Sequence, residues 1–133
     1  DPVFQSHFSA NYVDTLCTIQ QKYNNLFVTR PIPEIGLDVP RIYSRKLILS
    51  QTKEDIYIPL AEYMNRNKLV WNAQNQAAEK CGVKILNPIK YLCDSEKCYG
   101  TKKGRTLYFD DDHLSEVGNK LLIPMFKQIF DQE

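Results

Sequence analysis

Short apolar segments alternate with longer helical patterns along this chain, and that alternation limits the folds that it can adopt. Residues 11–25 are predicted to form an amphipathic helix, because apolar side chains recur there at three- and four-residue steps. Residues 26–28, "LFV", suit a buried strand, and the prolines of "RPIPE" prevent its continuation as a central strand. A second helix is predicted over residues 61–80, followed by Gly82 as a stop and by "VKIL" as a second strand.

The other segments give weaker signals. Residues 35–60 have mixed periodicity and prolines, so we expect a long surface excursion with short structured pieces. "TLYF", residues 106–109, is predicted to be a third strand. Ser115 is suited to cap a final helix that runs to about Phe130, and Pro124 is expected to kink that helix or to delay its start.

The element order is helix, strand, long connection, helix, strand, loop, strand, helix. This alternation predicts an α/β layered fold with a largely parallel sheet and flanking helices. A chain of 133 residues has the size of one domain, and no repeat or composition shift divides it, so residues 1–133 are predicted to form a single domain. Functional groups gather beyond the carboxyl ends of parallel strands, and Asp110 directly follows "TLYF".

Charge and hydropathy exclude several kinds of partner. Basic and acidic residues number 17 and 16 and no Lys/Arg block occurs, so neither nucleic acid nor an anionic membrane surface is an expected partner. The longest apolar run, "LLIPMF", is far shorter than the roughly 20 residues that cross a bilayer. The chain starts at Asp1 without Met and without a signal-peptide pattern, which suggests a processed or excised piece of a longer parent protein.

The four cysteines leave two interpretations open. Cys93 and Cys98 enclose the short turn-prone loop "CDSEKC", which favours a local disulfide in an oxidising compartment over two reduced thiols. A zinc site would need a second close pair of ligands, and none is present in the sequence. Cys17 and Cys81 lie in helical patterns and are expected to be buried thiols whose pairing cannot be deduced from sequence.

The segment "LYFDDDHLSEVGNK" carries the candidate chemistry. A histidine that acts as a general base needs one free ring nitrogen and a carboxylate on the other nitrogen. Asp110 and His113 are spaced so that the carboxylate can fold back onto the ring, whereas Asp111 and Asp112 are expected to face solvent. The alternatives are an acidic loop in which His113 only packs or caps, and a metal site, for which one His and diverging aspartates make a poor cage.

The same segment, together with "FVTRPIPEIGLDVP", "GVKILNPIKYLC" and the second cysteine, resembles the C-terminal extracytoplasmic SGNH domain of bacterial type 3 acyltransferases, which O-acetylate surface glycans. The resemblance implies a three-layer, flavodoxin-like α/β sheet and a Ser-His-Asp triad with Asp110 as orienting acid and His113 as base. It implies a disulfide between Cys93 and Cys98, a periplasmic location on a membrane-embedded parent, and an acyl donor and a glycan acceptor as partners. It implies no cofactor and no metal.

The chain departs from this family at its start. The family's serine lies in an early Gly-Asp-Ser block, followed by Gly and Asn oxyanion donors, and none of these blocks is in the sequence. Ser6 beside His7 only superficially imitates the motif, and Ser115 is better explained as a helix cap. We therefore expect the C-terminal portion of an SGNH domain, inactive alone, with an exposed sheet edge that a second copy could cover. The competing hypotheses are a non-catalytic binding or scaffold domain and a structural fragment with an incidental acidic loop.

Arg30, Glu34 and Trp71 could in principle contact a glycan, but a structural role is the simpler interpretation. Arg30 and Glu34 of "RPIPE" could line an acceptor site, but we expect a proline-shaped loop with solvated charges. Trp71 is expected to belong to the core rather than to a sugar-binding platform.

Overall fold

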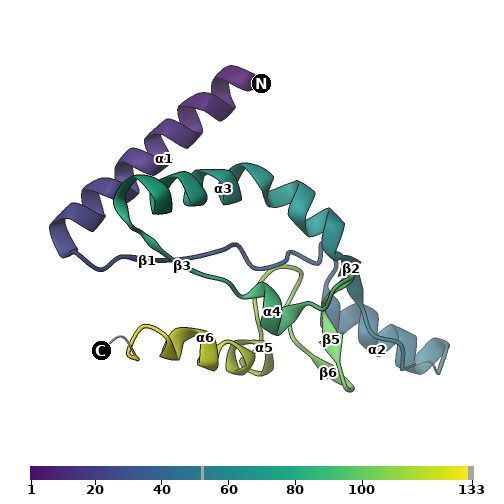
Figure 1. Cartoon of the computed structure of the whole chain (residues 1–133). Helices are drawn as coiled ribbons and strands as arrows, with labels where there is room; N and C mark the ends of the chain where they lie inside the picture. Colours follow the sequence, from purple (N-terminus) through teal and green to yellow (C-terminus); the bar gives the residue numbers. More distant parts are fainter. Residues whose placement is uncertain (52, 132–133) are drawn as a thin grey trace. The chain divides into compact units, whose positions relative to one another are not determined.

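The computed structural model describes residues 1–51 and 53–131. Its residues divide into two compact units (Figure 1). The first unit comprises Asp1–Pro31 and Asn65–Asn87, and the second comprises Ile32–Met64 and the chain from Pro88 onward. The single domain predicted for residues 1–133 stays a prediction.

The first unit contains helix α1 (Pro2–Tyr23), strand β1 (Phe27–Thr29), most of helix α3 (Leu60–Cys81) and strand β3 (Lys84–Leu86). β1 and β3 pair in parallel and run side by side in Figure 1. Both helices and both strands were predicted, and the positive φ of Gly82 confirms it as the stop after α3. α1 begins earlier than predicted, because the Asp1 carboxylate accepts a hydrogen bond from the Val3 backbone N–H and caps the helix.

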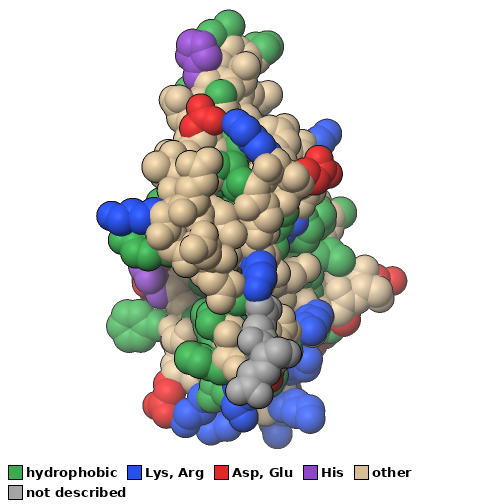
Figure 2. Space-filling model, turned by 60° about the vertical axis from the view of Figure 1, so that its left-hand side comes forward, with side chains coloured by type: hydrophobic (Ala, Val, Ile, Leu, Met, Phe, Trp, Pro, Cys, Tyr) green, Lys and Arg blue, Asp and Glu red, His purple; other side chains and the backbone are tan. Residues whose placement is uncertain are grey.

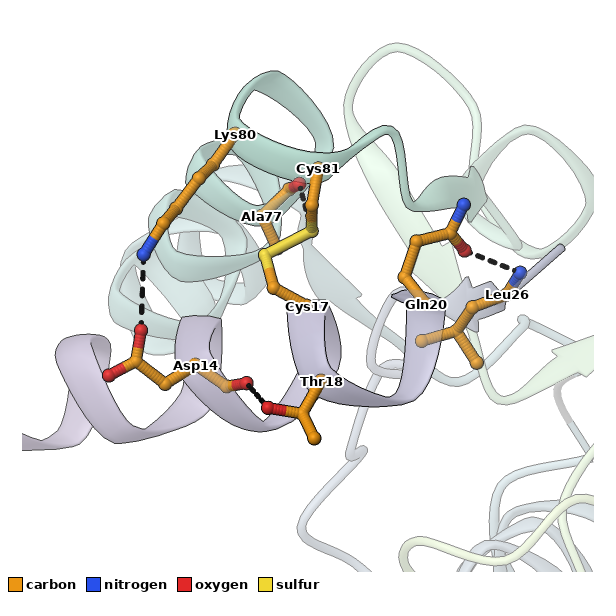
Figure 3. Close-up of a disulfide and its surroundings, with 8 residues drawn as sticks. All are labelled: Asp14, Cys17, Thr18, Gln20, Leu26, Ala77, Lys80 and Cys81. Atoms are coloured by element: carbon orange, nitrogen blue, oxygen red, sulfur yellow. Dashed lines mark hydrogen bonds and ion pairs between the residues drawn. A yellow bond between two sulfur atoms is a disulfide. The ribbon is translucent and has the colours of Figure 1, made fainter. Parts of the chain in front are cut away.

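A disulfide between Cys17 and Cys81 joins α1 to the end of α3, as Figure 3 shows. The expectation of two buried thiols was wrong in this respect, because the two cysteines lie on neighbouring helices with their Cα atoms 5.5 Å apart. Lys80 and Asp14 form an ion pair of 3.1 Å beside the disulfide. The apolar cluster of this unit surrounds the same junction and consists of Val13, Cys17, Ala77 and Val83, with Leu16, Leu26, Val28 and Cys81 packed against them.

The second unit is built from short elements. Two antiparallel pairs, β2 with β4 and β5 with β6, form its sheets. Its buried apolar side chains include those of Val39, Tyr63, Leu107, Tyr108 and Met125. The elements of this unit are α2 (Val39–Leu49), β2 (Tyr57–Pro59), α4 (Ile89–Leu92), β4 (Lys97–Tyr99), β5 (Thr101–Lys102), β6 (Arg105–Thr106), α5 (Glu116–Leu121) and α6 (Ile123–Lys127). The predicted α/β class is confirmed, and the parallel pairing is the β1–β3 sheet.

Two segments differ from the sequence-based expectation. The supposed excursion over residues 35–60 contains the 11-residue helix α2, which Asp38 caps through the backbone N–H of Arg41. Only Thr106 of "TLYF" lies in a strand, since β6 ends there and Tyr108 forms an isolated bridge with Leu114. The chain therefore turns back directly after Tyr108 instead of continuing along a sheet.

The C-terminal helix follows the prediction in its cap and its break, but it ends at Lys127 rather than near Phe130. Ser115 is the N-cap of α5, and the helix breaks at Leu122 before α6 begins, with Pro124 in its first turn. In Figure 2 acidic and basic side chains both occur on the face in view, and both histidine side chains reach the surface. Among the described residues, no helix has the length and the apolar character that a membrane crossing requires.

Candidate functional site

The candidate site is a tight loop that begins after Tyr108. The Phe109 N–H donates to the carbonyl oxygen of His113 at 2.7 Å, which closes the loop over the three aspartates. Beneath it, the buried Tyr108 hydroxyl donates to the carbonyl of Pro33 at 2.5 Å. These two bonds place Asp110 and His113 in one rigid turn.

The segment before α2 supports this turn from behind. The backbone N–H groups of Ile35 and Gly36 both donate to the Asp111 carbonyl, at 2.9 and 3.3 Å. The N–H of Val39, in the first turn of α2, donates to the Asp110 carbonyl at 3.2 Å. The segment "PIPEIGLDV" therefore stabilises the turn by hydrogen bonds to the backbone carbonyl groups of Asp110 and Asp111.

The other end of the turn is held by α5. The Ser115 hydroxyl donates to the Thr106 carbonyl at 2.9 Å and accepts from the Gly118 N–H at 3.2 Å. Both hydrogen-bonding roles of this hydroxyl are thus used by the helix cap, as the sequence predicted. Gly118 packs directly on the backbone of Leu107, since a Cβ built on it would lie 2.1 Å from the Leu107 oxygen.

Asp110 and His113 lie together in this turn. Asp110 Oδ2 is 2.8 Å from His113 Nδ1, while its Oδ1 accepts from the backbone N–H groups of Asp112 at 3.0 Å and His113 at 2.7 Å. One carboxylate thus fixes both the loop backbone and the imidazole ring. The Asp110 side chain is 34% exposed and that of His113 is 75% exposed, so most of the ring remains open to solvent. This geometry agrees with the spacing argument, and the catalytic role of the pair stays a prediction.

The electrostatics of the pair favour a charged carboxylate and a basic imidazole. Hydrogen bonds from the backbone of His113, then of Asp112, lower the pKa of Asp110 to about 2. The hydrogen bond to Asp110, followed by the charges of Asp110 and Asp112, raises the pKa of His113 above its ordinary value. A carboxylate that stays ionised can stabilise the imidazolium that forms when His113 takes a proton.

The second aspartate of interest, Asp112, departs from expectation. Its Oδ1 also lies 2.8 Å from His113 Nδ1, and its side chain is 46% exposed, so it faces the ring rather than only solvent. Asp111 is exposed, as predicted. Asp110, Asp112 and His113 each offer one atom within 4.8 Å of the others, which is compatible with a cation. Because the same Nδ1 and Asp110 oxygens already bond within the loop, we favour the hydrogen-bonded pair over a metal site.

The remaining sequence candidates lie elsewhere. Arg30 is only 7% exposed, so the expectation of a solvated charge was wrong. Its guanidinium donates to the Trp71 carbonyl and to Gln74 Oε1, both at 2.9 Å, and stacks 4.1 Å from the centre of the Trp71 ring. It also bonds the side chain of Asn75. Arg30, which follows β1, thus connects that strand to α3. The Trp71 ring that it stacks on is half-buried. Glu34, in contrast, is exposed.

The serine and histidine near the start of the chain belong to helix α1. Ser6 and His7 are exposed in the first turns of that helix, in the first unit. A serine inside a helix lacks the turn after a strand that the resemblance to the family implies for the nucleophile. The structure thus adds nothing in favour of Ser6 as a nucleophile.

The loop disulfide between Cys93 and Cys98 is confirmed. Inside it, Asp94 accepts from the N–H groups of Glu96 and Lys97 and from the Tyr99 hydroxyl, and these hydrogen bonds lower the pKa of Asp94 to about 2, the Tyr99 bond contributing most. The disulfide and this carboxylate together fix the start of β4.

The comparisons with known proteins assign the chain to a family. The sequence profile described as "SGNH domain (fused to AT3 domains)" matches residues 1–128, and the chain therefore belongs to this family. No curated protein is a significant match.

A solved structure adds to the family assignment. The periplasmic domain of a lipopolysaccharide acetyltransferase from Salmonella ser. Paratyphi A is similar to this chain, with a TM-score of 0.67 and 17% identity. The similarity covers 93% of this chain and 51% of the solved one, so this chain spans about half the length of the protein that it matches. At this identity the similarity establishes the fold.

Proposed function

We propose that this chain supplies the histidine and aspartate of a Ser-His-Asp acyl-transfer site in an O-acetyltransferase that modifies surface polysaccharide. The observation that carries the proposal is the 2.8 Å contact between Asp110 Oδ2 and His113 Nδ1, with Oδ1 held by two backbone N–H groups. This arrangement orients the ring and leaves Nε2 as the nitrogen that can exchange a proton.

In the proposed reaction, a serine oxygen attacks the carbonyl carbon of an acetyl donor while His113 Nε2 takes the serine proton. The donor's leaving group departs with that proton, which leaves an acetyl-serine. A sugar hydroxyl then gives its proton to Nε2, and its oxygen attacks the acetyl carbon. Collapse of this intermediate returns the proton to serine and releases the acetylated sugar. Throughout, Asp110 remains ionised and stabilises the imidazolium.

The serine in this proposal comes from sequence outside these 133 residues. The Ser115 hydroxyl makes two hydrogen bonds as a helix cap, and no Gly-Asp-Ser motif occurs in the chain. The family description, with its fused AT3 domains, and the similarity to half of a periplasmic acetyltransferase domain support a larger, membrane-embedded parent with this part on the periplasmic side. The two disulfides suit that oxidising location.

The test compares the two histidines of the chain. We would prepare this chain preceded by its native upstream sequence, and measure hydrolysis of 4-nitrophenyl acetate and acetyl transfer to polysaccharide. His113→Ala should lower kcat/KM by at least about 10³-fold, because it removes the base of the triad. His7→Ala, on the exposed face of α1, is the matched control and should keep the wild-type rate.

Two outcomes would count against the proposal. Retention of activity in His113→Ala would remove His113 from the chemistry. An upstream-extended protein that binds glycan but cleaves and transfers no acetyl ester would favour the non-catalytic binding or scaffold domain instead.

A further inference from the structure

The outer face of the β2–β4 ribbon carries aromatic and charged side chains. Tyr57 lies directly opposite Tyr99 in the antiparallel register, and the next pair, Ile58 and Cys98, faces inward and is buried. Alternation along each strand therefore puts the two tyrosines on the same, outward side. Tyr57 is 45% exposed, and its ring meets that of Tyr99 edge-on with centroids 6.4 Å apart.

A hollow of about 460 Å³ opens on this face, within the second unit. We call it the tyrosine hollow. Its volume lies within the range of roughly 300–1,000 Å³ that is typical of small-molecule sites. The side chains that line it come from α2, the segment before β2, β2 itself and β4, and they are Lys46, Glu54, Asp55, Tyr57, Lys97 and Tyr99.

Several of these side chains are held in place before any ligand arrives. The Tyr99 hydroxyl donates to Asp94 at 2.5 Å, and Asp55 accepts from the hydroxyl of the fully buried Thr101 at 2.9 Å. The Lys97 ammonium lies 4.2 Å from the centre of the Tyr57 ring. Exposed side chains that are already fixed lose little conformational entropy on binding, which is the property expected of a recognition surface.

The chemistry of the lining indicates the ligand class. Two ammonium groups and two carboxylates give no net charge, so neither an anion nor a cation is favoured. A sugar ring carries hydroxyl groups that both donate to carboxylates and accept from ammonium groups, and it has an apolar C–H face that can pack on a tyrosine ring. A neutral sugar can therefore bond both kinds of charged group in the hollow and pack on a tyrosine ring.

The hollow and the candidate site share one helix. The first residue of α2, Val39, bonds the Asp110 carbonyl, while Lys46 of the same helix lines the hollow. Seven residues of helix advance about 10 Å, so Lys46 at the hollow lies about two helical turns from the residue that bonds the candidate turn. We propose that the tyrosine hollow binds a neutral sugar unit of the acceptor glycan. This inference rests on the proposed function for its biological ligand, but sugar binding itself needs no ester chemistry.

The test is a binding measurement on the chain as it stands, independent of any acetyl-ester assay. Backbone N–H spectra of the wild-type chain would be recorded while methyl galactoside, methyl mannoside or methyl rhamnoside is added at millimolar concentration, with glucuronate as the anionic comparison. At least one neutral sugar should shift the resonances of residues 54–57 and 97–99. Saturation transfer from protein to that sugar should fall at least about fivefold in Tyr57→Ala.

Tyr91→Ala is the matched control, because Tyr91 also carries a lysine over its ring, Lys90 at 4.9 Å, but lies in α4 outside the hollow. It should bind the sugar as the wild type does. The proposal is overturned if no neutral sugar shifts these resonances, if the shifts lie elsewhere, if glucuronate binds more tightly, or if both tyrosine variants lose binding equally. Because the wild-type spectra locate the site, the test does not depend on the stability of Tyr57→Ala.

Discussion

Gly118 packs on the backbone of Leu107 so closely that a side chain cannot be added without movement. A Cβ on Gly118 would lie 2.1 Å from the Leu107 oxygen and 2.9 Å from Leu114 Cδ2. This contact sets α5 against the strand end that leads into the candidate turn. The absence of a side chain at Gly118 therefore lets α5 pack against the residue that leads into the turn of Asp110 and His113.

Gly118→Ala is expected to destabilise the chain by about 3 kcal/mol, the upper end of the usual cost of overpacking, because the backbone oxygen can give way only if α5 shifts. Urea unfolding followed by circular dichroism measures the change. Gly82→Ala is the comparison: no heavy atom lies within 4 Å of the added Cβ, so the only cost is the strain that a side chain adds at its positive φ, about 1 kcal/mol. An equal or smaller loss for Gly118→Ala would contradict the packing described here.

The two disulfides are expected to differ in their contribution to stability. The Cys17–Cys81 bond closes a sequence separation of 64 residues and the Cys93–Cys98 bond one of 5. Chain entropy of the unfolded state then predicts losses of about 4 and about 2 kcal/mol when the respective pair is replaced by serine. Urea unfolding of the two double variants measures both losses of unfolding free energy. A larger loss for the Cys93–Cys98 pair than for the Cys17–Cys81 pair would contradict this prediction.

His113 should titrate above its ordinary pKa, since the bond to Asp110 raises the pKa of the imidazole. A raised folded-state pKa means that the stability this group contributes is fully present below the unfolded-state pKa and is lost as pH rises through the folded-state value. Asp110 acts in the opposite sense: its pKa is about 2, so its contribution is present above its ordinary pKa of 3.8 and is lost as pH falls toward 2. Proton NMR should show a downward shift of the His113 pKa in Asp110→Asn.

The two carboxylates beside His113 should not be equivalent. Both lie 2.8 Å from Nδ1, but only Asp110 is fixed by two backbone N–H groups as well. In the upstream-extended protein we expect Asp110→Asn to lower kcat for ester hydrolysis by at least about 10³-fold and Asp112→Asn by less than about tenfold. Equal losses would mean that either carboxylate can orient the ring.

The sequence predicted best the features that depend on local interactions. The Ser115 cap, the stop at Gly82 and the break near Pro124 all follow from residue type and spacing, and all three are present. The Asp110–His113 contact also follows from a spacing of three residues within one turn.

Features that depend on tertiary contacts were missed. Helix α2 was missed for a more local reason: the prolines of residues 35–60 count against a helix, whereas Pro40 lies in the first turn of α2, where proline is tolerated. Nothing local marks Arg30 as buried, because its partners lie more than 40 residues away on α3. The pairing of Cys17 with Cys81 likewise depends on how α1 and α3 meet.

The measurement that tests the central claim most directly is the pH dependence of kcat/KM for acetyl-ester hydrolysis by the upstream-extended protein. If His113 is the general base, the rate should rise with pH through the same pKa that NMR gives for His113, and Asp110→Asn should move that midpoint downward while lowering the plateau. A profile with no rise in that range, or a midpoint that Asp110→Asn leaves in place, would contradict the assignment of His113 and Asp110 as the acid–base half of the site.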